Sequence, residues 1–398
     1  MTARKHLAPA GLALCLLISA LMFILEPVPH GHRYDIALKL TLALSAFWVL
    51  AEVKPAWTTQ KGVLILACLA GLGLGIGESS VNNSEIVQVY DSVFSTIRDG
   101  RNPYTAGMIY HKAEFQKTVY GNFNYPPMEI HPYHLAATLA GAWNGTVMTS
   151  VFIVLHLLVC LVFLATFPEV KRRYLVPFFP LFLFSEIVTT SAMTFLMTAL
   201  ILFVVKRDQA EPRPGYRVLI AVLFGVGLMT KFLIIPLMAA YYGRAIDWKR
   251  PATILRTVPD VAIALAVAGL IMAPYGVAAV LKETILFNLV LKDRAAMTTF
   301  YPNVLSGPMT WAGFGDLYPI AAMGLLVAAV LVASKLELVP AMMAVTYTFL
   351  FVAATPEPQY IPVMLYLALF GVFLQLEKTD ARILRRPPSG PAHPARVP

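Results

Sequence analysis

The sequence predicts an all-α fold: a polytopic transmembrane helical bundle of about 10–12 spans, with amphipathic surface helices in the first long outer loop. Hydrophobic residues fill 58% of the 398 positions, charged residues only 13%, and the mean hydropathy is +0.69. A soluble domain carries about 25% charged residues. This chain therefore lacks the polar surface that would cover a fold in water.

Segments that are apolar enough to cross a bilayer follow one another along the chain. A transmembrane helix needs about 20 mostly apolar residues, and fewer where neighbours bury it. The predicted spans are 8–26, 36–53, 62–77, 147–167, 174–188, 190–205, 217–229, 231–243, 257–278, 317–333, 338–354 and 360–376. The first is expected to be an uncleaved helix, because Glu26 and Pro27 form no small-residue cleavage site. The stretch 217–243 is too long for one span and predicts a hairpin of two short helices.

The basic residues predict which side each loop faces. The net charge is +9, and 21 of the 31 Lys and Arg residues share one side if the N-terminus is cytoplasmic. The positive-inside rule explains that bias, so the charge indicates cytoplasmic loops and not a nucleic-acid partner. We expect a multi-pass protein of the plasma (inner) membrane with both termini in the cytoplasm. One domain would cover 1–384, with outer loops at 78–146 and 279–316, and 385–398 would be a disordered tail.

The first outer loop begins with a predicted amphipathic helix over 84–98. Apolar residues recur there at i, i+3, i+4, i+7, i+8 and i+11, which is one helical stripe. The residues of the stripe are Ile86, Val89, Tyr90, Val93, Phe94 and Ile97. Glu85 stands at the start of the helix and Asp91 on another face. We expect the helix to lie on the membrane surface with its apolar face toward the lipid.

A second short helix is predicted over 128–142, after a turn at 100–104. Pro126 and Pro127 lead into it from an extended segment. At its start stand His131 and His134, three residues apart, with Glu129. Either Glu129 or Glu85 could complete a divalent-cation site with these histidines, although such a pair is more common in helices that bind no metal.

Lys231 is the most conspicuous charged residue, because it interrupts the long apolar stretch of the predicted hairpin. A lysine within a membrane domain usually faces a cavity or a partner. At the outer end of a short helix, Lys231 could bind a phosphate, extend to the membrane interface, or pair with Glu186. In the second outer loop, Lys282, Lys292 and Arg294 are further phosphate candidates or simply solvated.

In chain order, these features resemble the GT-C superfamily of integral membrane glycosyltransferases, in particular the polyprenol-phosphate-mannose-dependent α-mannosyltransferases. The matching motifs are the acid Glu85 or Asp91, then Gly100-Arg101-Asn102-Pro103-Tyr104, Tyr125-Pro126-Pro127, Met229-Thr230-Lys231-Phe232 and Gln359-Tyr360. The chain departs from the family in having glutamate where an aspartate is usual. Its acid also follows the third predicted span and not the first.

The resemblance implies transfer of a sugar, mannose or a similar one, from a polyprenyl-phosphate donor to a hydroxyl of a glycolipid or glycan acceptor in the cell envelope. It implies Glu85 or Asp91 as the catalytic base. Lys231, Lys292 and Arg294 would bind the donor phosphate. The residues expected in the substrate cavity are Asn102, Tyr104, Tyr125, His131, Glu186, Gln359 and Tyr360. A divalent cation, Mg²⁺ or Mn²⁺, is the one cofactor considered.

Two other classes of protein stay open at this point. A secondary transporter or flippase of an anionic or lipid-linked substrate would have broken helices in two related halves, and the sequence shows no such symmetry. A structural or assembly subunit would not explain why the outer loop contains amphipathic helices. In every case the lipid bilayer is a partner, and no nucleic acid is expected.

Overall fold

The computed structural model describes residues 85–112, 117–167, 192–247, 249–291 and 305–352, together with the single positions Val363, Tyr366, Leu367, Phe370, Gly371 and Leu374. The predicted spans at 8–26, 36–53, 62–77 and 174–188 lie outside the described residues. So do most of the predicted span at 360–376 and the tail at 385–398. The described part is mostly helical, as predicted.

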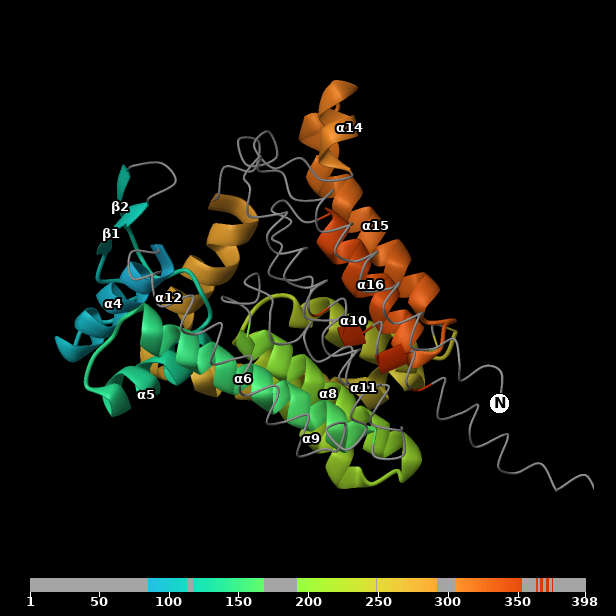
Figure 1. Ribbon diagram of the computed structural model, residues 1–398. Helices are drawn as coiled ribbons and strands as arrows, with labels where there is room; N and C mark the ends of the chain where they lie inside the picture. The colour runs from blue at the N-terminus through green and yellow to red at the C-terminus, as the bar shows by residue number, and fades with distance from the viewer. Residues whose placement is uncertain are drawn as a thin grey trace, which may run out of the picture.

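The longer helices of the described part follow the predicted order (Figure 1). They are α4 (Glu85–Arg98), α5 (Ile130–Ala140), α6 (Gly145–Thr166), α8 (Ala192–Ala210), α9 (Pro214–Leu228), α10 (Ile234–Ala245), α11 (Pro251–Met272), α15 (Tyr318–Ala333) and α16 (Leu338–Val352). Shorter helical turns are η4 (Pro127–Glu129), η8 (Ala273–Tyr275), α12 (Val277–Leu281), η9 (Lys282–Leu291), α14 (Ser306–Trp311) and η10 (Gly315–Leu317).

Three helices among the described residues are long and apolar enough to cross a membrane: Gly145–Thr166, Ala252–Tyr275 and Gly315–Ala333. They fall on three of the predicted spans. The stretch 217–243 holds two helices, α9 and α10, as predicted, and the intervening turn carries Lys231. The described part thus confirms the predicted helical character, and three of its helices have the length and apolar composition of membrane spans.

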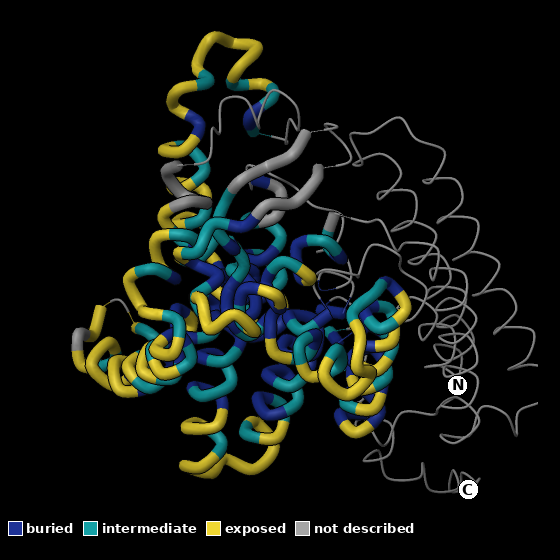
Figure 2. The backbone as a smooth tube through the Cα atoms, turned by 90° about the vertical axis from the view of Figure 1, so that its left-hand side faces the viewer, coloured by how far each residue is buried: buried dark blue, intermediate teal, exposed yellow. Residues whose placement is uncertain are grey.

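The helices pack in a continuous series. Helix α6 contacts α8, α8 contacts α9, and α9 contacts α11, whereas α10 contacts α15 and α16. Figure 2 shows the buried segments gathered in the centre of the molecule, with exposed turns above and below. The approach of α9 to α11 requires Gly225, since a Cβ there would lie 2.5 Å from the Ala264 carbonyl oxygen.

One element of the first outer loop was not predicted. Strands β1 (Met108–Lys112) and β2 (Lys117–Gly121) form a two-stranded antiparallel hairpin, with Met108 opposite Gly121. The all-α prediction overlooked it because each strand is only five residues long and pairs locally. Two short strands give too weak an alternation to be recognised in a loop.

Helix α4 forms where predicted, but protein covers its apolar stripe. Tyr90 lies 4.6 Å from Tyr133 between ring centroids, and Phe94 lies 5.0 Å from Trp143. The Trp143 indole N–H donates to the Val87 carbonyl oxygen at 2.8 Å. The expectation that this face meets lipid is therefore wrong for these residues, because α5 and the segment after it occupy the position that lipid would take.

Candidate functional site

The candidate site forms where the first outer loop meets the turn between α9 and α10. The Met128 backbone N–H donates to the Met229 carbonyl oxygen at 2.9 Å. This bond joins two segments that are about 100 residues apart in the sequence, an interval that no local pattern spans. It brings Glu129 and Lys231, one residue and two residues further on, into the same buried region.

Local sequence explains why both segments take this shape. Pro126 is extended, with φ −62° and ψ 154°, and Pro127 opens the single 3-10 turn that ends at Glu129. On the other side, Thr230 is fully buried. Its hydroxyl donates to the Gly227 carbonyl oxygen at 2.7 Å and accepts from Thr194 of α8 at 3.1 Å. The turn that carries Lys231 is therefore fastened to the bundle.

Glu129 and Lys231 are both buried, with exposed fractions of 1% and 5%. Burial raises the pKa of Glu129 to about 8, although the positive charge of Lys231 acts in the opposite direction. One carboxyl oxygen, Oε1, has no hydrogen-bond partner among the described residues. A buried polar atom without a partner costs free energy, so it marks a place where a ligand or a proton would be stabilised.

Aromatic side chains surround this pair. The Lys231 ammonium lies 5.4 Å from the centroid of the Tyr125 ring, within the range of a cation–π contact. The Tyr104 hydroxyl donates to the Tyr125 carbonyl oxygen at 2.7 Å. Burial and the charge of Glu129 raise the pKa values of Tyr90 and Tyr133, so both hydroxyls stay protonated. The walls of the site are therefore neutral, and its ionisable groups at neutral pH are Glu129 and Lys231.

Asn102 connects this loop to the end of α11. Its Nδ2 donates to the Tyr275 carbonyl oxygen at 2.6 Å, and its Oδ1 accepts from the Tyr104 backbone N–H at 3.0 Å. Both the Nδ2 and the Oδ1 atom of the Asn102 amide therefore make hydrogen bonds within the protein. Asn122 makes a similar connection, because its Nδ2 donates to Glu283 of η9 at 3.1 Å. The two asparagines position the loop that carries the site.

The acids predicted as the base lie on α4. Asp91 is exposed on the helix surface, and Glu85 is the first residue of the helix, where its side chain lies outside the described residues. The structure therefore brings Glu129, not Asp91, to Lys231. Of the other predicted residues, Tyr104 and Tyr125 belong to the aromatic wall.

His131 lies at the edge of the site, with its ring 6.3 Å from that of Tyr275. Burial and the neighbouring His134 lower its pKa, so the imidazole is neutral at pH 7. Within the part of the chain that the structure describes, no group of three or more His, Cys, Asp or Glu side chains is placed to hold a metal ion. Glu129, His131 and His134 do not assemble such a group.

Five predicted site residues lie outside the described residues. They are Glu186, Lys292, Arg294, Gln359 and Tyr360. Their roles stay predictions. Glu129, by contrast, is a site residue that sequence reasoning considered only as a metal ligand. The sequence feature that could have identified Glu129 is its position between Met128 and Ile130. A carboxylate in such an apolar setting is seldom buried without a partner or a function.

Comparison with protein-family models, with curated proteins and with solved structures gave no match for this chain. The function therefore has to be argued from the site itself.

Proposed function

We propose that the chain is a polytopic membrane glycosyltransferase that moves a sugar from a polyprenyl-phosphate donor to a hydroxyl of a lipid-linked or cell-envelope acceptor. The observation that carries the proposal is the buried pair of Glu129 and Lys231 beside the Tyr125 ring. Such a transfer needs a cation for the departing phosphate and a carboxylate for the proton of the acceptor. Both are present at one end of the bundle.

Lys231 supplies the cation in this proposal. The ammonium group is held on a turn that Thr230 fastens to α8, so it is preorganised and not a mobile surface charge. As the bond between the anomeric carbon and the phosphate oxygen breaks, its electron pair goes to the phosphate. Lys231 stabilises that developing charge, and the polyprenyl tail remains in the bilayer.

The proposed base is a carboxylate that takes the proton of the acceptor hydroxyl as the hydroxyl oxygen bonds to the anomeric carbon. Glu85 and Asp91 are the candidates from the sequence, and the structure adds Glu129. A carboxyl with a pKa of about 8 is a stronger base than an ordinary glutamate once it is ionised. Because burial raises its pKa, Glu129 holds its proton to higher pH than an ordinary glutamate, and its carboxylate form increases as the pH rises.

The membrane arrangement is part of the same proposal. We place the Glu129–Lys231 end of α9 at the outer face, because the opposite ends of α8, α9, α10 and α11 carry the basic residues expected in the cytoplasm. Among them are Arg207, Arg213, Arg244 and Arg256. Both termini would then be cytoplasmic, and the donor would reach the site from the outer leaflet.

The experiment is transfer from a radiolabelled polyprenyl-phosphate sugar in membranes that contain the full-length protein. We expect Glu129→Gln and Lys231→Ala each to lower the rate by about 100-fold or more, in the range of a lost general base or anion-stabilising charge. Glu85→Gln and Asp91→Asn are measured beside them and identify which carboxylate is the base.

Matched controls are Glu211→Gln and Lys249→Ala, which remove the same charges from exposed positions away from the site. These variants should keep the wild-type rate. Full activity of Lys231→Ala and of all three acid variants would refute the site. Absence of transfer from every such donor by the wild-type protein would refute the enzyme.

A secondary transporter or flippase is the second candidate, and one observation favours it. Glu129 would change its protonation near neutral pH, as the acid of a proton-coupled transporter does. That function predicts movement of an anionic lipid across vesicles without chemical change, accelerated by a pH gradient and abolished by Glu129→Gln. Transfer of label to the acceptor distinguishes the enzyme from the transporter.

A further inference from the structure

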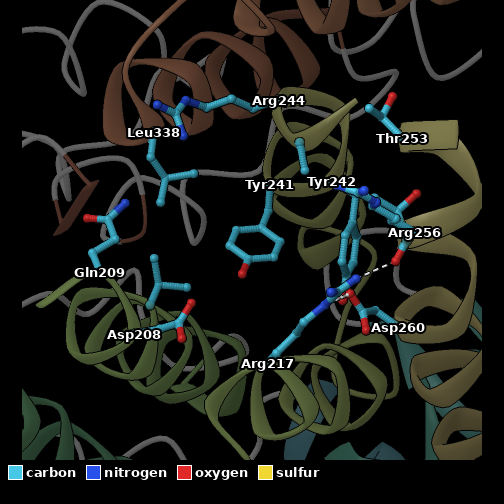
Figure 3. A pocket seen from close by; sticks show the side chains of 13 residues that line it. Asp208, Gln209, Arg217, Tyr241, Tyr242, Arg244, Thr253, Arg256, Asp260 and Leu338 are labelled. Atoms are coloured by element: carbon cyan, nitrogen blue, oxygen red, sulfur yellow. Dashed lines mark hydrogen bonds and ion pairs between the residues drawn. The ribbon is translucent and has the colours of Figure 1, made fainter. Parts of the chain in front are cut away.

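A second polar site lies at the other end of the same helices. A cavity of about 360 Å³ opens between the C-terminal ends of α8 and α10 and the N-terminal ends of α9 and α11 (Figure 3). The length of helix α9, about 20 Å, separates this cavity from the turn that carries Lys231. The charged side chains that line it are Asp208, Arg217, Arg244, Arg256 and Asp260.

The positive charges of this cavity exceed the negative ones. Arg217 Nε donates to the buried carboxylate of Asp260 at 2.6 Å, and its Nη2 donates to the Arg256 carbonyl oxygen. Arg244 Nε donates to the Leu336 carbonyl oxygen at 2.8 Å. Among the described residues, the Arg256 guanidinium makes no hydrogen bond or ion pair. Three arginines face two aspartates, so the cavity carries a net positive charge.

A buried hydroxyl is left without a partner in the same lining. Tyr242 is 6% exposed, and its hydroxyl has no hydrogen-bond partner in the part of the chain that the structure describes. In Figure 3 its ring points toward the Arg217–Asp260 pair. A buried O–H without an acceptor costs free energy that an anionic oxygen would recover. Tyr242 and Arg256 thus each bring a hydrogen-bond donor to the lining of the same cavity.

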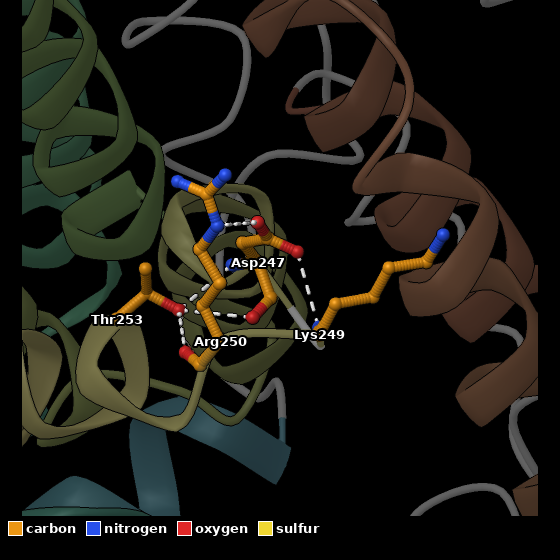
Figure 4. Close-up of polar contacts among 4 residues, drawn as sticks. All are labelled: Asp247, Lys249, Arg250 and Thr253. Carbon is orange, nitrogen blue, oxygen red and sulfur yellow. Dashed lines mark hydrogen bonds and ion pairs between the residues drawn. The ribbon is translucent and has the colours of Figure 1, made fainter.

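The rim of the cavity is held in place by the turn between α10 and α11 (Figure 4). The Asp247 backbone N–H donates to the Thr253 hydroxyl oxygen at 2.9 Å, and that hydroxyl donates to the Arg250 carbonyl oxygen at 2.7 Å. The Asp247 carboxylate accepts from the Lys249 backbone N–H at 3.1 Å and pairs with Arg250 at 3.4 Å. Thr253, which lines the cavity, is therefore fixed before any ligand arrives.

Next to the cavity, α11 exposes a strongly apolar face. Ile254, Leu255 and Val258 are exposed in the first turns of the segment Ala252–Tyr275, which is long and apolar enough to cross a membrane. Thr253, Arg256, Thr257 and Asp260 of these same turns line the cavity. Polar and apolar binding surfaces therefore adjoin along one helix. An amphiphile fits both surfaces, whereas a free anion would use only the cavity.

We propose that this cavity binds the phosphate of an anionic phospholipid, whose acyl chains lie along the exposed apolar face of α11. Arg256 and the Tyr242 hydroxyl donate to the phosphate oxygens. The volume of the cavity is in the range that holds small ligands. Basic pockets between membrane helices are known to bind such headgroups, and the attraction is strongest at an anionic membrane surface.

The test is thermal unfolding of the full-length protein in a neutral detergent, titrated with phosphatidylglycerol, with phosphatidylcholine of the same acyl chains, and with glycerol 1-phosphate. Phosphatidylglycerol should raise the melting temperature with a saturable dependence. Arg256→Ala should weaken its apparent affinity by about tenfold, and Tyr242→Phe by about threefold. Within the described ranges the Arg256 side chain has no partner to lose, so its variant should fold like the wild type.

Lys249→Ala is the matched control, because it removes an equal charge from an exposed position on the same rim outside the lining. It should change the affinity by less than twofold. An equal loss in Lys249→Ala and Arg256→Ala would mean unspecific attraction to a charged surface and would overturn the proposal. So would equal stabilisation by phosphatidylcholine. Binding of glycerol 1-phosphate as tight as that of the lipid would assign the cavity to a soluble anion instead.

Discussion

Glu129 is the residue whose protonation should govern the stability of the described fold. Its pKa in the folded protein is about 8, above the ordinary 4.5, so the folded chain holds this proton more tightly than the unfolded chain. The resulting stabilisation is complete below pH 4.5, decreases as the pH rises, and is lost above pH 8. The acid is therefore retained at a cost to stability, as is typical of functional groups.

Thermal unfolding of the wild type and of Glu129→Gln should show this cost directly. We expect the melting temperature of the wild type, relative to the variant, to fall between pH 5 and pH 8 and then to level off. The difference between the two proteins isolates Glu129 from the other titrating groups. A constant difference over that range would show that Glu129 is ionised throughout.

Single residues also show where sequence reasoning stops. Lys231 could be singled out from the sequence, because a lysine within an apolar stretch is conspicuous without any structure. The proximity of Glu129 to Lys231 could not be predicted, since it depends on a backbone hydrogen bond between Met128 and Met229 and not on any local pattern. Periodicity reports on neighbours within a helix or strand, and this contact joins two loops.

At the scale of elements, the close packing of α9 on α11 is the most demanding feature. A Cβ at Gly225 would meet the Ala264 carbonyl oxygen at 2.5 Å and the Val267 Cβ at 2.7 Å. Backbone atoms cannot move aside cheaply, so the two helices would have to separate. Helix α9 ends at the Lys231 turn and begins at the cavity lined by Arg217, so a change at this interface should reach both.

Gly225→Ala should lower the free energy of unfolding by about 1–3 kcal/mol, the usual cost of overpacking. Chemical or thermal unfolding in detergent measures the change. Gly215→Ala is the matched control in the same helix, because a Cβ at that position has no described atom within 4 Å. Equal stability of the two variants would contradict the observed approach of α9 to α11.

The helices were predicted best where their apolar stripe repeats over several turns. Helix α4 begins and ends within a residue of its predicted range, because its stripe extends over three turns. The surroundings of that stripe were not predictable. A row of apolar side chains has the same spacing whether lipid or Tyr133 and Trp143 will cover it. The strand hairpin was missed for the opposite reason, because its pattern is too short.

For the whole molecule, the two sites lie at opposite ends of one set of helices. In Figure 1, α4, α5 and the strands gather at one end, from which α6, α8 and α9 extend away. If the bundle crosses a membrane as proposed, the Glu129–Lys231 site and the phosphate cavity face different leaflets. The outer site would take the sugar donor, and the cavity an anionic lipid of the cytoplasmic leaflet.

Cysteine labelling tests this orientation without an activity assay. Ser95→Cys on the exposed side of α4 should react with a membrane-impermeant maleimide in intact cells. Lys249→Cys, on the turn at the other end, should react only after the cells are permeabilised. Labelling of both positions in intact cells, or of Lys249→Cys alone, would overturn the arrangement.

The hydrogen bond from the Met128 amide to the Met229 carbonyl group has one more consequence. It is made by main-chain atoms, so its donor is present with any residue except proline at position 128. The connection between the first outer loop and the α9–α10 turn therefore does not use the side chains of Glu129 or Lys231. Substitutions at positions 129 and 231 should therefore change the chemistry of the site and leave this backbone hydrogen bond in place.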